Sequence, residues 1–102
     1  MILHDITDNN FDDNIKGDKT LVDFFATWCG PCKMLSVELE MLAKENNSLK
    51  IVKVDVDKCP NIARKFSIMS VPTLLLYKDG NMVDKKTGYM PIENIKEWIN
   101  NY

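Results

Sequence analysis

The sequence predicts an α/β domain with a central mixed sheet and helices on both of its faces. Short apolar segments of strand character alternate along the chain with amphipathic helical segments, as in strand–helix–strand units. The last two strand segments are separated only by the turn dipeptide Asp79-Gly80, so they are expected to form an antiparallel hairpin. The 102 residues, 45% of them apolar, suit one domain spanning 1–102. We therefore expect a five-stranded sheet flanked by four helices.

The first half of the chain supplies two strands and two helices. Residues 2–6 are the weakest strand candidate, and 8–15 form a short helix with two apolar residues one turn apart. Residues 19–26 form a continuous apolar run with two phenylalanines, which is typical of a strand buried on both faces. From 33 to 47, three leucines recur at positions i, i+4 and i+7 while polar residues line the opposite side. This periodicity predicts an amphipathic helix.

The second half supplies three strands and two helices. Residues 50–56 alternate between two faces, with three valines on one of them, which predicts a strand. A short helix over 60–66 and a continuously apolar strand over 73–77 follow. After the glycine turn, 82–87 completes the hairpin. Pro91 then opens the last helix, whose isoleucines form one stripe.

The charge balance argues against several classes of protein. Thirteen basic and fifteen acidic residues give a net charge of −2, whereas a nucleic-acid-binding protein needs a basic face for phosphates. The longest apolar run is far shorter than the ~20 residues of a membrane span. The N-terminus has neither the basic nor the apolar region of a secretory signal, so we expect a cytoplasmic protein. Without a nucleotide-binding glycine motif, no cofactor is expected.

A pair of cysteines carries the chemistry. Residues 28–32 read Trp-Cys-Gly-Pro-Cys and lie where the strand 19–26 meets the following helix. Cysteines at this spacing share one face of a helix start, so their sulfurs can reach disulfide geometry. Cys29 lies at the helix N-terminus, where free N–H groups and the helix dipole stabilise a thiolate, whereas Cys32 lies inside the helix. This asymmetry predicts one attacking and one resolving thiol.

A zinc site is the alternative use of this pair. Zinc takes about four ligands, and only Cys59 and His4 remain as candidates, far from the pair in sequence. We therefore favour redox chemistry and expect no metal. Cys59 itself has two interpretations, a reactive regulatory thiol near a helix start or a partly buried bystander. The lack of a partner cysteine favours the bystander.

These motifs, in this order, resemble the thioredoxin family, and the resemblance covers nearly the whole chain. The matching segments are 24–34 with the cysteine pair, 53–57, 71–74, 79–80 and Gly88. The resemblance implies the thioredoxin fold and the activity of a protein-disulfide reductase, in which Cys29 attacks a client disulfide and Cys32 resolves the mixed disulfide. The Gly-Pro pair between the cysteines is similar to the reducing members, because oxidases and isomerases usually carry a histidine there.

The resemblance also implies an acid–base role for a carboxylate in the first long strand. Asp23 is flanked by apolar residues, so we expect it to be buried with a raised pKa. It matches the family's residue that exchanges a proton with Cys32, and Lys53 matches the lysine paired with that carboxylate. The alternative is a structural buried ion pair with no part in catalysis.

The residues around the pair are expected to bind client proteins. Pro72 is cis in the family and faces the cysteines, whereas the alternative is a trans proline that only starts a strand. An apolar patch around Cys29 would bind the extended backbone of a client. Its residues are Trp28, Gly30, Pro31, Val71, Pro72 and Gly88. The chain departs from the family pattern at Val37, Met69, Ser70 and Tyr89.

Two kinds of partner follow from the resemblance: client proteins that contain disulfides, and a thioredoxin reductase that draws on NADPH or ferredoxin. The protein itself is expected to be a monomer. Two alternatives remain, a binding module whose cysteines are incidental and an exported oxidant or isomerase. The complete motif with Asp23, Lys53 and Pro72 counts against the first. The missing signal and the Gly-Pro pair count against the second.

Overall fold

Five strands form one mixed sheet in the computed structural model, which describes residues 1–102. The strands are β1 (Ile2–Leu3), β2 (Lys19–Phe25), β3 (Lys50–Asp55), β4 (Thr73–Lys78) and β5 (Asn81–Thr87), in the spatial order β1-β3-β2-β4-β5. The first three run parallel, whereas β4 is antiparallel to β2 and β5 is antiparallel to β4. The mixed sheet expected from the sequence is thus confirmed.

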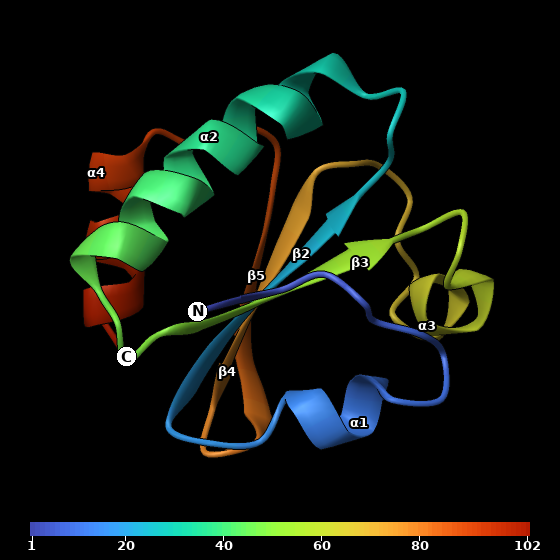
Figure 1. The fold of residues 1–102 in the computed structure, drawn as a ribbon, viewed down its shortest axis with the longest axis horizontal. Helices are drawn as coiled ribbons and strands as arrows, with labels where there is room; N and C mark the ends of the chain where they lie inside the picture. Colours follow the sequence, from blue (N-terminus) through green and yellow to red (C-terminus); the bar gives the residue numbers. More distant parts are fainter.

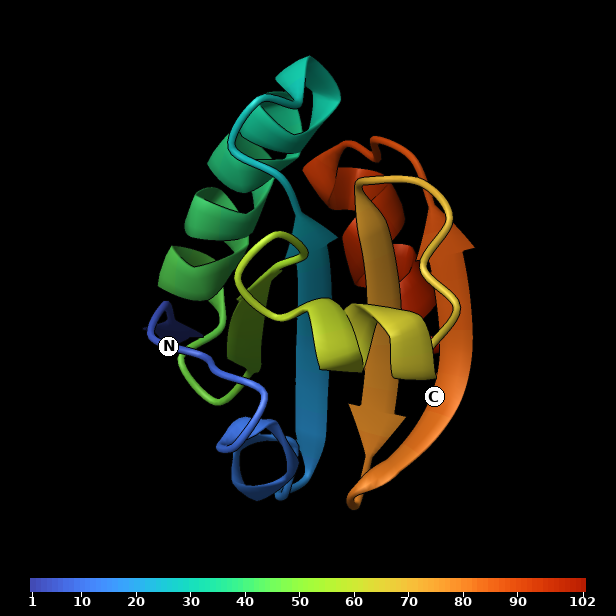
Figure 2. The same ribbon diagram turned by 90° about the vertical axis from the view of Figure 1, so that its right-hand side faces the viewer.

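Helices cover both faces of this sheet (Figures 1 and 2). They are α1 (Phe11–Asn14), α2 (Gly30–Glu45), α3 (Pro60–Lys65) and α4 (Ile92–Asn100). The leucine stripe of α2 and the isoleucines of α4 form one buried cluster with one side of the sheet. Phe11 of α1 and Ile62 of α3 form a second cluster with the other side. The central strands are apolar on both faces because each face is covered by a helical layer.

Three elements differ from the expected ranges by more than one residue at an end. The helix expected from residue 33 begins at Gly30, because Pro31 fits its first turn. The strand expected over 2–6 ends at Leu3, and the helix expected over 8–15 is reduced to α1. Between them, the side chains of Thr7 and Asn10 bind backbone N–H groups in a turn. Such local bonds compete with regular secondary structure, so the strand ends early and the helix starts late.

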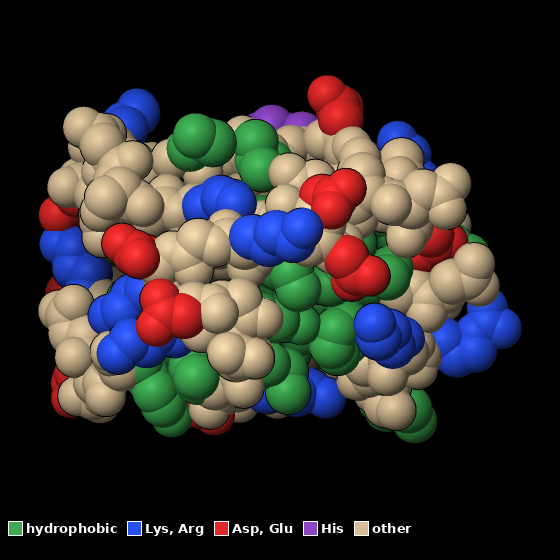
Figure 3. All heavy atoms as spheres, turned by 90° about the horizontal axis from the view of Figure 1, so that it is seen from below, with side chains coloured by type: hydrophobic (Ala, Val, Ile, Leu, Met, Phe, Trp, Pro, Cys, Tyr) green, Lys and Arg blue, Asp and Glu red, His purple; other side chains and the backbone are tan.

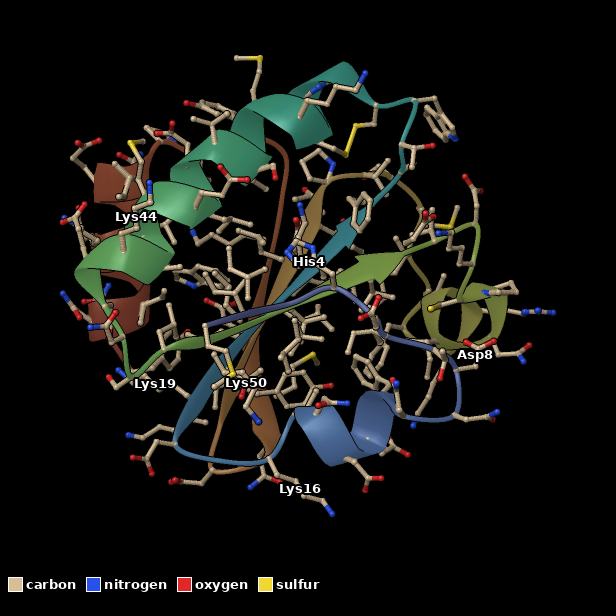
Figure 4. The ribbon with its side chains drawn as sticks, viewed as in Figure 1. His4, Asp8, Lys16, Lys19, Lys44 and Lys50 are labelled. Carbon is tan, nitrogen blue, oxygen red and sulfur yellow. A yellow bond between two sulfur atoms is a disulfide. The ribbon has the colours of Figure 1, made fainter.

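Side chains from distant segments complete the ends of three helices (Figure 4). Asp8 lies beside α3, where its Oδ1 accepts a hydrogen bond from the Ile62 N–H at 3.0 Å. Lys50 of β3 donates to the carbonyl of Asn14, the last residue of α1, and to that of Lys16 just after it. Lys19 of β2 donates to a carbonyl in the last turn of α4 at 3.0 Å. These bonds satisfy backbone groups that a helix leaves unpaired, and they fix each helix to the sheet.

The molecular surface carries both signs of charge. On the face shown in Figure 3, basic and acidic side chains are interspersed around a group of hydrophobic side chains, with no field of one sign. This mixture matches the small net charge of the whole sequence. None of the four helices combines the length and the apolar composition that crossing a membrane requires.

Candidate active site

The cysteine pair lies at the junction of β2 and α2, at the end of the sheet where α3 also connects to β4 (Figure 1). Cys29 is the N-cap residue of α2, and its Sγ accepts a hydrogen bond from the Cys32 N–H at 3.2 Å. The two cysteines are joined by a disulfide with their Cα atoms 5.2 Å apart. Both are buried within the junction, with Cys29 6% and Cys32 3% exposed. The sulfur of Cys29 therefore occupies the position that stabilises negative charge at a helix start.

The loop before β4 lies directly against this pair. The Val71–Pro72 peptide bond is cis, so the trans alternative is wrong. The Cys29 Sγ lies 3.7 Å from the Val71 carbonyl oxygen. On the other side of the loop, the Pro72 carbonyl accepts the Gly88 N–H at 2.9 Å. Gly88 has φ 92°, which a residue with a side chain rarely adopts. Segments far apart in sequence thus meet at the cysteine pair.

A buried ion pair lies on the neighbouring strands. Asp23 of β2 and Lys53 of β3 are in register, and the Lys53 Nζ lies 3.8 Å from the Asp23 Oδ2. Asp23 is completely buried, and neither of its carboxylate oxygens has a hydrogen-bond partner. Burial raises the pKa of Asp23, and the Lys53 charge lowers it by a smaller amount, so that the pKa lies at about 6, above the ordinary value of 3.8. The burial and the raised pKa expected for Asp23 are both found.

Ser36 is a site residue that the sequence reasoning missed. The Lys53 Nζ donates a hydrogen bond to the Ser36 Oγ at 2.8 Å. Both side chains line a cavity of about 220 Å³ that also touches Cys32, which is one helical turn before Ser36. The spacing from Cys32 to Ser36 is the only sequence signal for this contact, since residues four apart share a helix face.

An exposed rim surrounds the pair. Trp28 is 71% exposed, and its Nε1 donates to the Asp57 Oδ2 at 3.1 Å. Beside it lies an apolar pocket of about 200 Å³ whose lining residues are Trp28, Val56, Ile68, Met69, Ser70 and Val71. Gly30 and Pro31 are exposed, Val71 and Gly88 are half-buried, and Pro72 is buried. The residues expected to form the patch are therefore exposed or half-buried, except Pro72, which is buried.

Cys59 lies apart from this site, within the core between the sheet and α3. Its side chain is completely buried, and its Sγ lies 3.2 Å from the Ile6 carbonyl oxygen. Burial, and secondly the charges of Asp8 and Asp55, raise the pKa of this thiol. The structure therefore favours the bystander interpretation. His4 is exposed, and no three His, Cys, Asp or Glu side chains gather closely enough to hold a metal ion.

Comparison with known proteins identifies the family of this chain. A family model described as Thioredoxin matches residues 2–101. The chain belongs to the thioredoxin family. It is 52% identical to a thioredoxin of Staphylococcus saprophyticus over 100 residues, covering 97% of this chain and 96% of the relative. It is 48% identical to a thioredoxin of Staphylococcus haemolyticus over 103 residues, covering 100% of this chain and 99% of the relative.

The fold supports the same assignment. A solved structure of a mutant thioredoxin from Halobacterium salinarum superimposes with a TM-score of 0.91 at 34% identity, covering 99% of this chain and 89% of that one. The thioredoxin family membership and the Cys29–Cys32 disulfide make this protein a thiol-disulfide oxidoreductase that reduces protein disulfides. The resemblance seen in the sequence is confirmed, as is the thioredoxin fold.

Proposed function

We propose that Cys29 is the attacking thiol and Cys32 the resolving thiol in the reduction of client proteins. The Cys29 thiolate attacks one sulfur of a client disulfide, which forms a mixed disulfide and releases one client thiolate. Cys32, after losing its proton, attacks the Cys29 sulfur, releases the second client thiolate and leaves the Cys29–Cys32 disulfide. The observation that carries this assignment is the N-cap position of Cys29, whose sulfur accepts the Cys32 N–H at 3.2 Å.

Asp23 acts as the base for the resolving step. A carboxylate with a pKa of about 6 is largely ionised at neutral pH and is basic enough to accept a thiol proton. The cavity that touches Cys32 and Lys53 offers room for water between these groups. Lys53 balances the negative charge of Asp23 from the adjacent strand at 3.8 Å. The proton that leaves Cys32 therefore passes to Asp23, directly or through water.

Client proteins bind along the rim of the cysteine pair. The exposed face of Trp28 and the neighbouring Gly30 and Pro31 offer a flat surface. The main chain at Val71, close to the Cys29 sulfur, offers hydrogen-bonding groups to an extended client segment. Pro72 and Gly88 hold this loop in place through their backbone hydrogen bond. Binding by backbone and by shallow apolar contact suits clients of many sequences.

A thioredoxin reductase returns the pair to its dithiol form, with NADPH or ferredoxin as the electron source. The protein works in the cytoplasm, where a reducing environment favours a dithiol that is oxidised only during turnover. Residues 1–102 act as one domain and as a monomer. The single sheet that contains all five strands supports the one-domain organisation. Light scattering after gel filtration measures the oligomeric state.

Insulin reduction tests this function. The protein should accelerate the precipitation of insulin chains by dithiothreitol, and then by NADPH with thioredoxin reductase or by reduced ferredoxin with its own reductase. Cys29→Ser should lower the rate to that of the reductant alone. Cys32→Ser should accumulate a mixed disulfide between Cys29 and the client. A mixed disulfide that accumulates in Cys29→Ser instead would reverse the two roles, and full function of Cys29→Ser would favour a binding module.

A further inference from the structure

The ammonium group of Lys53 is held by a hydroxyl rather than by the carboxylate it faces. Its Nζ lies 2.8 Å from the Ser36 Oγ but 3.8 Å from the Asp23 Oδ2, which is beyond hydrogen-bond distance. The same Nζ lies 4.8 Å above the centre of the Phe25 ring, which contacts it from a further side. Two neutral groups therefore fix the cation about one ångström short of a hydrogen bond to Asp23.

The Asp23 carboxylate has no other partner that could take the place of this bond. Both oxygens are buried, and neither accepts a hydrogen bond. Across the sheet on β4, Asp23 faces Leu74, which carries no charge. Lys53 is the charged group that faces it from β3, while α2 brings Cys32 and Lys33 to the adjoining cavity. A buried carboxylate that lacks hydrogen bonds holds its proton more strongly than one that accepts them.

We propose that Ser36 is a positioning residue, which holds the Lys53 ammonium off the Asp23 carboxylate and so keeps that carboxylate a stronger base for the resolving step. The catalytic consequence rests on the proposed role of Asp23 as proton acceptor. The reason is electrostatic: an ammonium in direct hydrogen-bonded contact would stabilise the ionised carboxylate further and weaken its attraction for the thiol proton.

The place of Ser36 in the fold suits this role. Ser36 follows Cys32 by one turn on the same face of α2, so its hydroxyl and the resolving sulfur border the same cavity of about 220 Å³. Without the hydroxyl, the Lys53 ammonium still lies over the Phe25 ring, and the Asp23 Oδ2, which has no hydrogen-bond partner, lies 3.8 Å from it. The ammonium would then move onto the carboxylate rather than stay at its present distance.

The carboxyl group itself supplies the first test, because its titration does not depend on activity. Carbon-13 NMR of the oxidised protein follows the Asp23 side chain in the parent, in Ser36→Ala and in Ser36→Thr, which keeps a hydroxyl. We expect Ser36→Ala to lower the titration midpoint by about one pH unit, and Ser36→Thr to leave it close to the parent value. In a Lys53→Met background the same Ser36→Ala change should have no effect, because the ammonium is absent.

A midpoint that stays in place or rises in Ser36→Ala overturns the proposal. The same holds for an equal shift in the Lys53→Met background, since the effect would then not pass through Lys53. A general disturbance of packing would not produce a lowered midpoint in Ser36→Ala, an unchanged midpoint in Ser36→Thr and no further change when Ser36→Ala is added to Lys53→Met.

The second test concerns the reaction. Reduced protein mixed with 5,5′-dithiobis(2-nitrobenzoate) releases one coloured thiolate when Cys29 attacks and a second when Cys32 resolves the mixed disulfide. We expect the second release in Ser36→Ala to slow several-fold at neutral pH and its acidic limb to move to lower pH with the carboxyl midpoint, while the first release is unchanged. If the midpoint moves and the second release does not, the proposed acid–base role of Asp23 is contradicted, and the placement of Lys53 by Ser36 is not.

Discussion

Asp23 shows at the scale of one residue how function and stability oppose each other. Its carboxylate is buried without a hydrogen bond, although an ammonium group lies 3.8 Å away. Such an arrangement destabilises the folded state whenever the group is ionised, because no hydrogen bond replaces those that water made to the carboxylate. The same burial gives the group a pKa of about 6, which suits proton transfer near neutral pH.

Replacing Asp23 by alanine should therefore stabilise the protein. The folded-state pKa of about 6 lies above the ordinary value of 3.8, so the unfolded chain ionises first as pH rises. The parent loses stability relative to Asp23→Ala between these two pH values, by about 3 kcal/mol in all, and the difference is constant above the folded pKa. A cavity cost of about 1 kcal/mol leaves a net gain of about 2 kcal/mol near neutral pH.

Urea unfolding of both oxidised proteins at a series of pH values from 4 to 7 measures this difference. Asp23→Asn, which keeps the volume, separates the charge effect from the cavity. A difference that does not change over this range contradicts the raised pKa. A less stable Asp23→Ala protein with full insulin-reducing activity would identify Asp23 as a purely structural partner of Lys53.

The two cysteines of the site should differ in reactivity once reduced. The Cys29 sulfur accepts a backbone N–H at the start of α2, whereas Cys32 lies inside the helix and is the less exposed of the two. Limiting iodoacetamide near neutral pH should therefore label Cys29 before Cys32, and peptide mass mapping identifies the labelled residue. Predominant label on Cys32 would reverse the assignment of attacking and resolving thiols.

At the scale of one element, α3 depends on a side chain from outside the helix. Its N-cap residue, Cys59, makes no capping hydrogen bond with its side chain. Asp8 takes this place, since its Oδ1 accepts the Ile62 N–H at 3.0 Å and its Oδ2 accepts the Asn61 N–H at 3.4 Å. A carboxylate there also opposes the positive end of the helix dipole. The segment after β1 and the helix after β3 are thus joined by one carboxylate.

We expect Asp8→Ala to reduce the free energy of unfolding by about 1 kcal/mol, because two backbone N–H groups lose their acceptor. Asp8→Asn should lose less, since its amide oxygen still accepts. Asp13→Ala is the matched control, because Asp13 of α1 pairs only with the exposed Lys16 and should change stability by less than about 0.5 kcal/mol. Urea unfolding of the three variants compares them. Equal effects of Asp8→Ala and Asp13→Ala would contradict the capping role.

At the scale of the whole molecule, the two buried clusters on either side of the sheet determine which thiols are accessible to solvent. Cys59 belongs to the core that also contains Phe11 and Ile62, and it is completely buried. A reagent can therefore label Cys59 only when this side of the molecule unfolds locally. The thiol therefore reports on the opening of the fold, whereas Cys29 reports on the site.

In a variant with Cys29→Ser and Cys32→Ser, Cys59 is the only thiol. We expect 5,5′-dithiobis(2-nitrobenzoate) to label it at least about a thousandfold more slowly in the folded protein than in denaturant, as a core position demands. Adding Asp8→Ala should speed the labelling by about fivefold, the factor that corresponds to 1 kcal/mol. Rapid labelling of the folded protein would instead restore the regulatory interpretation of Cys59.

The sequence by itself determined the features that depend on local spacing. Apolar periodicity predicts the leucine stripe of α2, and an aspartate inside a continuous apolar run predicts the burial of Asp23. Two cysteines three residues apart, with a proline between them, predict a disulfide at a helix start. In each case the physical cause acts between neighbours in the chain, so the pattern of residues is sufficient.

Tertiary structure alone decided the contacts that join distant residues. Lys53 and Ser36 are 17 positions apart, and Asp8 and Ile62 are 54 apart, yet each pair is joined by one hydrogen bond of about 3 Å. Which hydroxyl or N–H a polar group meets depends on how helices pack on the sheet, and no periodicity records it. The burial of Cys59 beside the Ile6 carbonyl belongs to the same class. For this reason the cysteine pair and the buried Asp23 were visible in the sequence, whereas the Ser36 hydroxyl that holds the Lys53 ammonium beside Asp23 was not.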